Sequence, residues 1–187
     1  FLHVYTEVIP YNKFNKLNKL NDNDTRQNHD IKGIILSGSP YSVINGNYPT
    51  IDFDFINNCN IPILGICYGS QLLAKMYGGE VIHKEHGEFG KHNINLITEQ
   101  SHSLLFDIPE KMNVWMSHND TIEVENKENS KIIILAKTNN DINAIFKIKD
   151  MNIYGIQFHP EVSHTENGNK FFYNFVKKCN ITEDYTI

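Results

Sequence analysis

The chain has 187 residues, of which 40% are hydrophobic and 21% charged, and its formal net charge is −5 at pH 7. A chain of this length fills one core well and is short for two, so we expect residues 1–187 to form a single domain. The negative balance gives no electrostatic reason to expect nucleic acid or an anionic membrane surface as a partner, and no apolar run approaches the roughly 18–20 residues that span a bilayer.

Short apolar runs that are rich in β-branched residues and bounded by Gly, Pro or Asn predict six strands. In chain order they cover residues 3–9, 32–38, 61–66, 131–138, 142–148 and 152–158. Helices are predicted within residues 48–58, 70–77 and 169–179, while the polar residues 12–28 suit a surface helix or a long loop. Alternation of strand and helix in the first half is typical of a parallel sheet covered by helices, so the sequence predicts an α/β fold.

The three cysteines, Cys59, Cys67 and Cys179, are scattered and odd in number. This usage argues against a disulfide framework and for a reducing compartment, and no basic-then-apolar leader opens the chain, so we expect a cytoplasmic protein. Cys59 and Cys179 lie in polar stretches without a partner motif and are expected to be inert thiols. Cys67 differs from them, because glycines flank it where an apolar run gives way to a helical pattern.

Residues 65–69 read Gly-Ile-Cys-Tyr-Gly, the thiol form of the nucleophile elbow. A sharp strand-to-helix turn strains the backbone of the nucleophile and brings neighbouring main chain close, which glycine permits at least cost. Cys67 would then lie at a helix N-terminus, whose positive dipole end favours a thiolate. The N–H of Tyr68 would point to where an oxyanion forms. A tight packing turn is the alternative interpretation of these five residues.

His159 and Glu161 form the second element of the predicted site. His159 ends a predicted strand and precedes Pro160, which pushes it to extended angles. In an extended chain, residues i and i+2 face the same side, so Glu161 can orient the His159 imidazole as the third member of a triad. Taken alone, the pair suits a strand-end histidine and a solvated charge. Because Cys67 and His159 both follow predicted strands, where open α/β sheets place active sites, the sequence favours the nucleophilic interpretation.

Residues 36–42, which read Leu-Ser-Gly-Ser-Pro-Tyr-Ser, form the third element. They directly follow a predicted buried strand, and their small residues suit a tight turn whose backbone N–H groups aim at a ligand. A turn of this kind beside Cys67 would supply a second donor to an oxyanion.

Together these motifs resemble the class I, or triad, glutamine amidotransferases, and within that family the amidotransferase domain of GMP synthetases. The matching stretches are ILSGSPYSV, IPILGICYGSQLLAKMYGGEV, GEFG, VWMSHND and IYGIQFHPEVSHTENG, which spread over nearly the whole chain. The resemblance implies a three-layer, mostly parallel, flavodoxin-like sheet flanked by helices, with added antiparallel strands in the second half. It also implies hydrolysis of glutamine and transfer of the ammonia to an ATP-pyrophosphatase domain or subunit, which aminates adenylylated XMP. We expect no metal or organic cofactor in the glutaminase reaction, since ATP and Mg²⁺ belong to the partner half.

By this resemblance, Cys67 attacks the glutamine carboxamide. His159, oriented by Glu161, protonates the departing ammonia and then activates the water that hydrolyses the thioester. The resemblance places the oxyanion hole at the backbone of Gly38, Ser39 and Tyr68. It places substrate contacts at four further residues, the last three of them in a loop that holds the amino-acid end of glutamine: Gln71, Ser117, His118 and Asn119.

The chain departs from the family pattern at three points. The usual Gly-Gly-Pro is Gly38-Ser39-Pro40 here, so backbone donation by Ser39 requires a φ that a non-glycine residue allows. The usual Ser-His-Gly-Asp has Asn119 in place of glycine, and Asn is the residue most tolerant of left-handed angles after glycine. The first strand of the family and the helix after it have no counterpart, so we expect the domain to lack them.

Other interpretations stay open at this point. An amidotransferase of another pathway, or a stand-alone Cys–His hydrolase similar to γ-glutamyl hydrolases, would use the same site. A non-catalytic regulatory subunit is suggested only by Ser39 and by the missing first strand. A metal site can be assembled from five side chains, but their spacing matches no closed zinc pattern and favours a solvated strand–loop–strand connection. These five are His83, Glu85, His86, Glu88 and His92.

Overall fold

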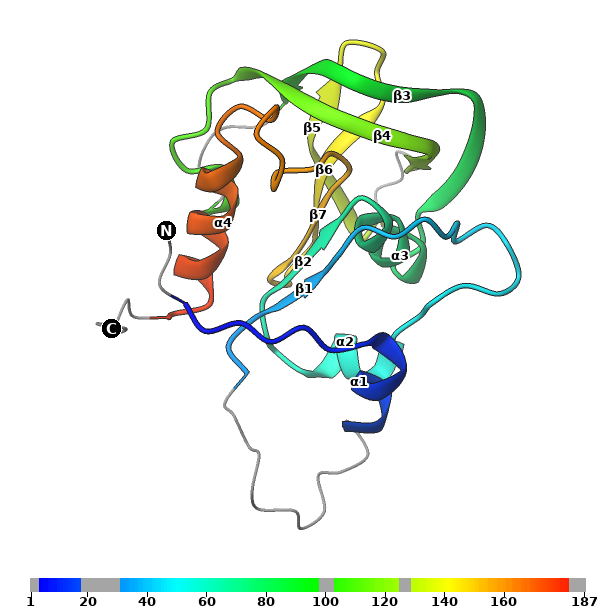
Figure 1. Ribbon diagram of the computed structural model, residues 1–187, viewed down its shortest axis with the longest axis vertical. Helices are drawn as coiled ribbons and strands as arrows, with labels where there is room; N and C mark the ends of the chain where they lie inside the picture. The colour runs from blue at the N-terminus through cyan, green and yellow to red at the C-terminus, as the bar shows by residue number, and fades with distance from the viewer. Residues whose placement is uncertain (1–3, 18–30, 98–102, 125–128, 182–187) are drawn as a thin grey trace.

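A computed structural model describes residues 4–17, 31–97, 103–124 and 129–181 (Figure 1). The elements in chain order are α1 (Tyr11–Leu17), β1 (Ile34–Leu36), α2 (Phe53–Asn58), β2 (Ile63–Ile66), α3 (Tyr68–Met76), β3 (Glu80–Leu96), the 3₁₀ turn η1 (Ser103–Leu105), β4 (Lys111–Glu123), β5 (Ile132–Thr138), β6 (Asn143–Ile148), β7 (Ile153–Ile156) and α4 (Gly168–Lys178). The predicted helices correspond to α2, α3 and α4. The polar segment 12–28 begins in α1, and its residues 18–28 lie outside the described ranges. No helix in this part of the chain is long and apolar enough to cross a lipid bilayer.

The strands of the described residues form one mixed sheet in the order β1-β2-β7-β6-β5-β3-β4. β1, β2 and β7 run parallel, whereas the pairings that join β7, β6, β5, β3 and β4 are all antiparallel. Every residue of β2 and β7 is buried, as is typical of parallel strands covered on both faces. The expected α/β sheet with antiparallel strands in its second half is thus confirmed, and parallel pairing is confined to three strands.

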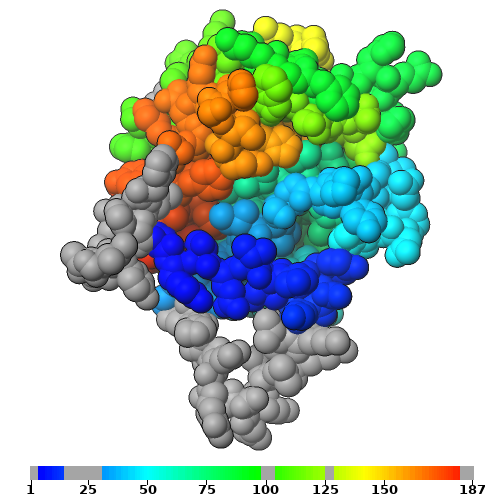
Figure 2. All heavy atoms as spheres, in the orientation of Figure 1, coloured from blue at the N-terminus to red at the C-terminus, as the bar shows by residue number. Residues whose placement is uncertain are grey.

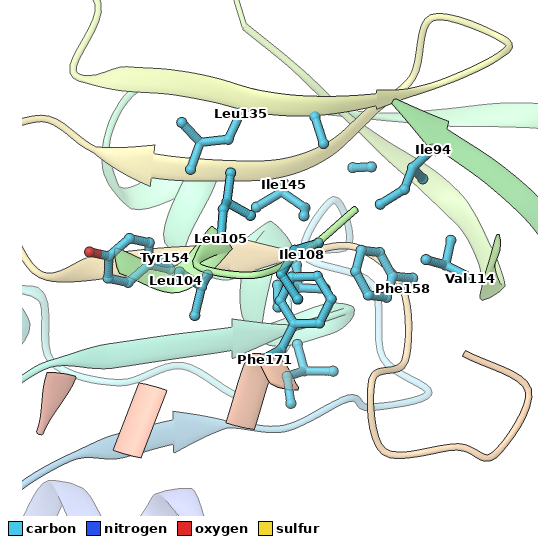
Figure 3. Packing of buried hydrophobic residues seen from close by; sticks show 14 of the residues in the cluster. Ile94, Leu104, Leu105, Ile108, Val114, Leu135, Ile145, Tyr154, Phe158 and Phe171 are labelled. Carbon is cyan, nitrogen blue, oxygen red and sulfur yellow. The ribbon is translucent and has the colours of Figure 1, made fainter. Parts of the chain in front are cut away.

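Two apolar clusters cover the two faces of the parallel half. Leu73 of α3 shares one cluster with Ile63 of β2, and Phe171 of α4 shares the other with Leu64. Ile63 and Leu64 are successive residues of a strand and point to opposite faces. The sheet therefore lies between α3 and α4, which gives the three layers. In the second cluster, Phe158 and Phe171 meet edge to face with their ring centroids 5.5 Å apart (Figure 3).

The predicted strand over residues 3–9 is wrong for the part that the structure describes. Residues 4–10 form neither helix nor strand, and Figure 2 shows the N-terminal residues, in blue, as a band along the surface. Val8 is 97% exposed and Tyr5 is 65% exposed. β-Branched and aromatic residues favour a strand when a neighbouring strand pairs with them and their side chains pack. Residues 4–10 have no such ladder with any described strand.

The hairpin of β3 and β4 is the part of the sheet that the sequence did not predict as two long strands. The strand–loop–strand connection expected around residues 83–92 is one irregular strand, because β3 runs from Glu80 to Leu96. Its ladder with β4 breaks register between His83 and Glu88. This hairpin carries one wall of the candidate site.

Candidate active site

Cys67 lies on the turn between β2 and α3, with φ 49° and ψ −106°. A positive φ is strained for a residue with a Cβ, and the surrounding main chain holds this turn in place. A Cβ added to Gly69 would lie 2.1 Å from the carbonyl oxygen of Leu36, and one added to Gly65 would lie 2.6 Å from the main chain of Gly69. Three pieces of main chain therefore touch behind Cys67, and glycine at both positions makes this contact sterically possible.

The His159 imidazole lies between a sulfur and a carboxylate. Its Nδ1 is 2.7 Å from Oε1 of Glu161, and the ring interacts with Cys67 on its other side. The bond to Cys67, followed by the bond to Glu161, raises the pKa of His159 to about 10, although burial opposes the shift. Burial alone would raise the pKa of Glu161, but the bond from His159, its own backbone N–H and the imidazolium charge together lower that pKa. At neutral pH the ring is therefore an imidazolium held beside Cys67.

The main chain of His159 is anchored to β4. Its N–H donates to the carbonyl oxygen of Trp115 at 3.0 Å. Oγ1 of Thr165 donates to the carbonyl oxygen of His159 at 2.6 Å and accepts from the N–H of Trp115 at 3.0 Å. The next residue, Glu166, accepts from the N–H and the Nδ2 of Asn113 at 2.9 and 2.8 Å. Thr165 and Trp115, which the sequence did not single out, thus hold the imidazole in position.

The turn after β1 adjoins both His159 and Cys67. A Cβ added to Gly38 would lie 3.2 Å from Cε1 of His159 and 3.8 Å from Cβ of Cys67. Ser39 is not among the non-glycine residues with positive φ, so the turn accepts a side chain at this position without backbone strain. The Ser39 hydroxyl accepts a hydrogen bond from the N–H of Tyr41 at 3.2 Å, which stabilises the turn.

Tyr68 is the first residue of α3. An N–H at this position has no carbonyl of a preceding helical turn to bond, so it can donate to a ligand near Cys67. The Tyr68 hydroxyl donates to the carbonyl oxygen of Pro49, and burial raises the pKa of Tyr68 to about 12. The side chain of Tyr68 is therefore structural, and its main chain is the part that adjoins the nucleophile.

A cavity of about 480 Å³ opens beside Cys67, within the usual size range of small-molecule sites. Six residues singled out from the sequence line it: Ser39, Cys67, Gln71, Ser117, His118 and Asn119. The lining is completed by Pro40, Tyr41, Ser42, Ile44, Asn45, His83, Phe89 and Asp120. Four other predicted site residues are not part of the lining and are connected to it through Cys67: Gly38, Tyr68, His159 and Glu161.

Gln71 and Gln157 connect this cavity to the nucleophile. Nε2 of Gln71 donates to the carbonyl oxygen of Asp120 at 2.9 Å and to Oε1 of Gln157 at 3.4 Å. Nε2 of Gln157, a fully buried residue, lies 3.9 Å from Sγ of Cys67. Both donors of Gln71 are used inside the protein, which leaves its side-chain oxygen for a ligand.

Ser117, His118 and Asn119 lie within β4, and not in the loop that the resemblance implied. The carbonyl oxygen of Ser117 is 3.9 Å from Sγ of Cys67. Asn119 has no positive φ, so this position does not use the tolerance of Asn for left-handed angles. The His118 side chain is 2% exposed, and its Nδ1 lies 3.0 Å from the carbonyl oxygen of Asp120. The ring of His118 is thus buried, with Nδ1 bonded to main chain and Nε2 facing the carboxylate of Glu88.

Asp120 and His83 form a polar pair in the cavity lining, with Oδ1 and Nδ1 2.9 Å apart. Of the five side chains that the metal hypothesis needed, His83 contacts Asp120, and His92 contacts Glu88. Over the described ranges, no group of three or more His, Cys, Asp or Glu side chains is placed to hold a metal ion. The Asp120 carboxylate instead suits a cationic group on a small ligand.

Residues 2–179 match the family Glutamine amidotransferase class-I. The chain is 46% identical over 188 residues to the GMP synthase (glutamine-hydrolyzing) of Petrotoga mobilis, in an alignment that covers 100% of this chain and 34% of that protein. It is 42% identical over 173 residues to the protein of the same name from Fusobacterium nucleatum, which covers 92% of this chain and 31% of the relative. The chain spans about a third of the length of the curated relatives it matches.

Solved structures of similar proteins also match this chain. A Thermoplasma acidophilum protein assigned as one subunit of a GMP synthase aligns with a TM-score of 0.66 and 30% identity over 81% of this chain and 74% of its own. A glutamine amidotransferase from Thermotoga maritima aligns with a TM-score of 0.60 over 85% of this chain and 70% of its own. The second protein is 24% identical to this chain, and its likeness concerns the fold.

Proposed function

The chain belongs to the class I glutamine amidotransferases, and from this premise we propose that it hydrolyses glutamine to glutamate and ammonia. The observation that carries the proposal is the grouping of Cys67, His159 and Glu161 beside the ends of β2 and β7, in which His159 bonds to Glu161 at 2.7 Å and Gly38 adjoins both Cys67 and His159. A thiol, an imidazole and an orienting carboxylate stand there in the sequence of contacts that acyl transfer by a cysteine requires.

The first half of the proposed reaction forms a thioester. Sγ of Cys67 attacks the carboxamide carbon of glutamine, a C–S bond forms, and the π pair moves onto the oxygen. The N–H groups of Gly38, Ser39 and Tyr68 are the donors that we assign to this oxyanion. The His159 imidazolium gives its proton to the amide nitrogen, the C–N bond breaks, and ammonia leaves.

The second half hydrolyses the thioester. Neutral His159 takes a proton from water while the water oxygen attacks the thioester carbon. The C–S bond breaks, glutamate leaves, and the thiolate of Cys67 and the imidazolium are restored. Glu161 keeps the ring oriented through its contact with Nδ1. In this proposal neither half uses a metal or an organic cofactor.

The substrate would occupy the cavity beside Cys67. Its α-ammonium group complements the carboxylate of Asp120, and the oxygen of Gln71 is an acceptor for a substrate N–H. The main chain of Ser117, His118 and Asn119 along β4 would bind the rest of the amino-acid end. In this proposal the carboxamide of glutamine would lie near the sulfur, and the cavity of about 480 Å³ is within the usual size range for a small ligand.

We further propose that the ammonia passes to an ATP-pyrophosphatase domain or subunit of a GMP synthetase, where ATP and Mg²⁺ serve the amination of XMP. Two findings support this assignment. The relatives at 46% and 42% identity are named GMP synthase (glutamine-hydrolyzing), and this chain matches only about a third of each.

The test is a glutaminase assay with and without the synthetase part, XMP and ATP. We expect slow hydrolysis that is strongly accelerated when all three are present. Full hydrolysis without them would identify a stand-alone hydrolase. Absence of hydrolysis in both conditions, with glutamine at saturation, would overturn the proposal and identify a subunit without catalytic activity.

A further inference from the structure

Glu88 is a buried carboxylate on β3, next to the strand that lines the cavity. Its side chain is 4% exposed, and it stands opposite His118 in the β3–β4 ladder. The ladder is interrupted just before it, because the preceding matched pair is His83 with Asp120. At this irregularity, a Cβ added to Gly87 would lie 2.3 Å from the carbonyl oxygen of His118. The bulge brings the two main chains together and turns Glu88 inward.

Two hydrogen-bond donors and two histidine rings surround the Glu88 carboxylate. Oε1 accepts hydrogen bonds from Oγ1 of Thr138 at 3.1 Å and from Nδ2 of Asn140 at 3.3 Å. Nδ1 of His92 lies 3.4 Å from the same oxygen, and Oε2 faces Nε2 of His118 at 3.6 Å. Burial alone would raise the pKa of Glu88, but these bonds and the charge of His92 lower it overall. Glu88 is therefore a carboxylate at neutral pH.

His118 connects this carboxylate to the cavity. Its Nδ1 lies 3.0 Å from the carbonyl oxygen of Asp120, which also accepts Nε2 of Gln71 at 2.9 Å. A carbonyl oxygen only accepts hydrogen bonds, so in this contact Nδ1 of His118 is the donor and Nε2 is the ring nitrogen that faces Glu88. Oε2 of Glu88 and Nε2 of His118 have no hydrogen-bond partner in the part of the chain that the structure describes, and they lie 3.6 Å from each other. Burying a polar atom without a hydrogen bond costs free energy, and the electrostatic contact between these two atoms offsets part of that cost.

We propose that Glu88 is a positioning residue for the glutamine site, acting through His118 on the segment that holds Gln71. The inference deepens the proposed function and rests on it, because it assigns Gln71 to the substrate. Without the carboxylate, the ring of His118 loses a buried neighbour and is held less firmly against the carbonyl of Asp120, which also accepts from the amide of Gln71. Cys67 follows β2, and His159 and Glu161 follow β7, so the triad lies on other segments of the chain than Glu88 and His118. Substrate binding therefore depends on Glu88 more than the chemical steps do.

The test measures glutamine affinity separately from turnover in the full-length protein. Iodoacetamide is expected to alkylate Cys67 and bound glutamine to protect it, so the glutamine concentration that halves the alkylation rate measures binding. For Glu88→Gln, this concentration and KM rise about tenfold, while kcat and the alkylation rate without glutamine change by less than about threefold. Glu85→Gln is the matched control, because Glu85 is an exposed carboxylate on the same strand, and it leaves all four quantities unchanged.

A double-mutant cycle tests whether Glu88 acts through His118. In the double variant with Glu88→Gln and His118→Gln, the glutamine concentration that halves the alkylation rate rises no further than in the single variant with the larger effect. Both substitutions break the same contact between Glu88 and His118, so their effects do not add. If the two single-variant increases in this glutamine concentration multiply in the double variant, the proposal is overturned. It is also overturned if glutamine protects Cys67 equally well in a folded Glu88→Gln protein. If Glu88→Gln does not fold, the exposed Asn140 provides the test. Asn140→Ala removes one donor to Oε1 and raises the concentration about twofold to threefold, and no rise would overturn the proposal.

Failure of the glutaminase assignment has a different signature. If glutamine protects Cys67 in the wild type but no ammonia appears with the synthetase part, the proposed function fails and the positioning role of Glu88 is still decided by protection. If glutamine does not protect Cys67 in the wild type, the positioning role is overturned as well.

Discussion

Nδ1 of His159 lies 2.7 Å from Oε1 of Glu161, and this contact leaves Nε2 as the ring nitrogen that can exchange a proton with Cys67. The carboxylate therefore fixes both the orientation of the ring and the nitrogen that acts on the sulfur side. Because the pKa of His159 is raised to about 10, the proton that departing ammonia needs is on the ring before glutamine binds.

Cys67→Ala should abolish glutamine-dependent synthesis and leave ammonia-dependent synthesis by the synthetase part intact. The reason is that only the first reaction needs the sulfur of Cys67. Product formation from glutamine and from ammonium chloride is measured side by side. Cys59→Ala, which removes a half-buried thiol at the end of α2, is the control and should retain both activities. Loss of both activities in Cys67→Ala would contradict the assignment of the nucleophile.

The contact between Cys67 and His159 should make stability depend on pH above neutrality. The pKa of His159 is about 10 in the folded protein against an ordinary value of 6.5. The folded state thus holds this proton more tightly, so the stabilisation is fully present below pH 6.5 and is lost as the pH rises through about 10. Urea unfolding at pH 7 and at pH 10.5 should show a larger loss in the wild type than in Cys67→Ala. Equal losses in the two proteins would disprove this coupling.

Ser39→Gly should change kcat for glutamine hydrolysis by less than about tenfold, roughly 1.4 kcal/mol. The backbone N–H that we assign to the oxyanion is present in both residues, and the φ of Ser39 already lies outside the left-handed region. Steady-state ammonia release is the measurement. Ser39→Ala is the matched control, because it removes the same hydroxyl and retains a Cβ. A fall of about a hundredfold in both variants would show that the hydroxyl itself takes part.

Thr165→Val should lower kcat about tenfold with little change in KM for glutamine. Valine keeps the shape of the side chain but removes the hydroxyl that joins the carbonyl of His159 to the N–H of Trp115. The imidazole would then lose part of its alignment with the sulfur. Ser163→Ala removes an exposed hydroxyl from the same loop and should have no effect. An unchanged kcat in a folded Thr165→Val protein would rule out this positioning role.

The sequence was most informative where a structural feature is local. The turn at Cys67 needs only its flanking glycines, and the contact of His159 with Glu161 needs only the two-residue spacing of an extended chain. The strands that carry these residues were predicted as well, because a buried parallel strand is apolar along its whole length. All of this information lies within a few residues of each feature.

Features that depend on distant partners were not predictable in the same way. Thr165 bonds to Trp115 across 50 residues, and nothing near Glu88 in the sequence indicates that it faces His118. The strand β4 carries a usable signal in the buried alternation of Met112, Val114 and Met116, but the polar residues that continue it conceal its length. Burial of those polar side chains is set by the neighbouring strand and not by their own type.

The strand predicted over residues 3–9 is wrong because its local pattern is favourable but its partner is missing among the described residues. Its β-branched and aromatic residues satisfy the local rule, but a strand also needs a neighbour to accept its backbone hydrogen bonds. Val8, at 97% exposed, shows that the described part of this segment gains no packed face. Composition alone does not reveal whether such a neighbour is present.

The contact of Gly69 with Leu36 sets the mechanical tolerance of the site. The end of β1 and the start of α3 come from separate parts of the chain, and the atoms that limit their approach are the carbonyl group and the Cβ of Leu36. Small shifts of the outer side-chain atoms in either apolar cluster therefore have little effect on the distance between the N–H of Tyr68 and the N–H groups of Gly38 and Ser39, which we assign to one oxygen atom. A single methyl group at Gly69 would instead act as a wedge. It would push the start of the helix away from β1 and move the N–H of Tyr68 out of alignment with those of Gly38 and Ser39.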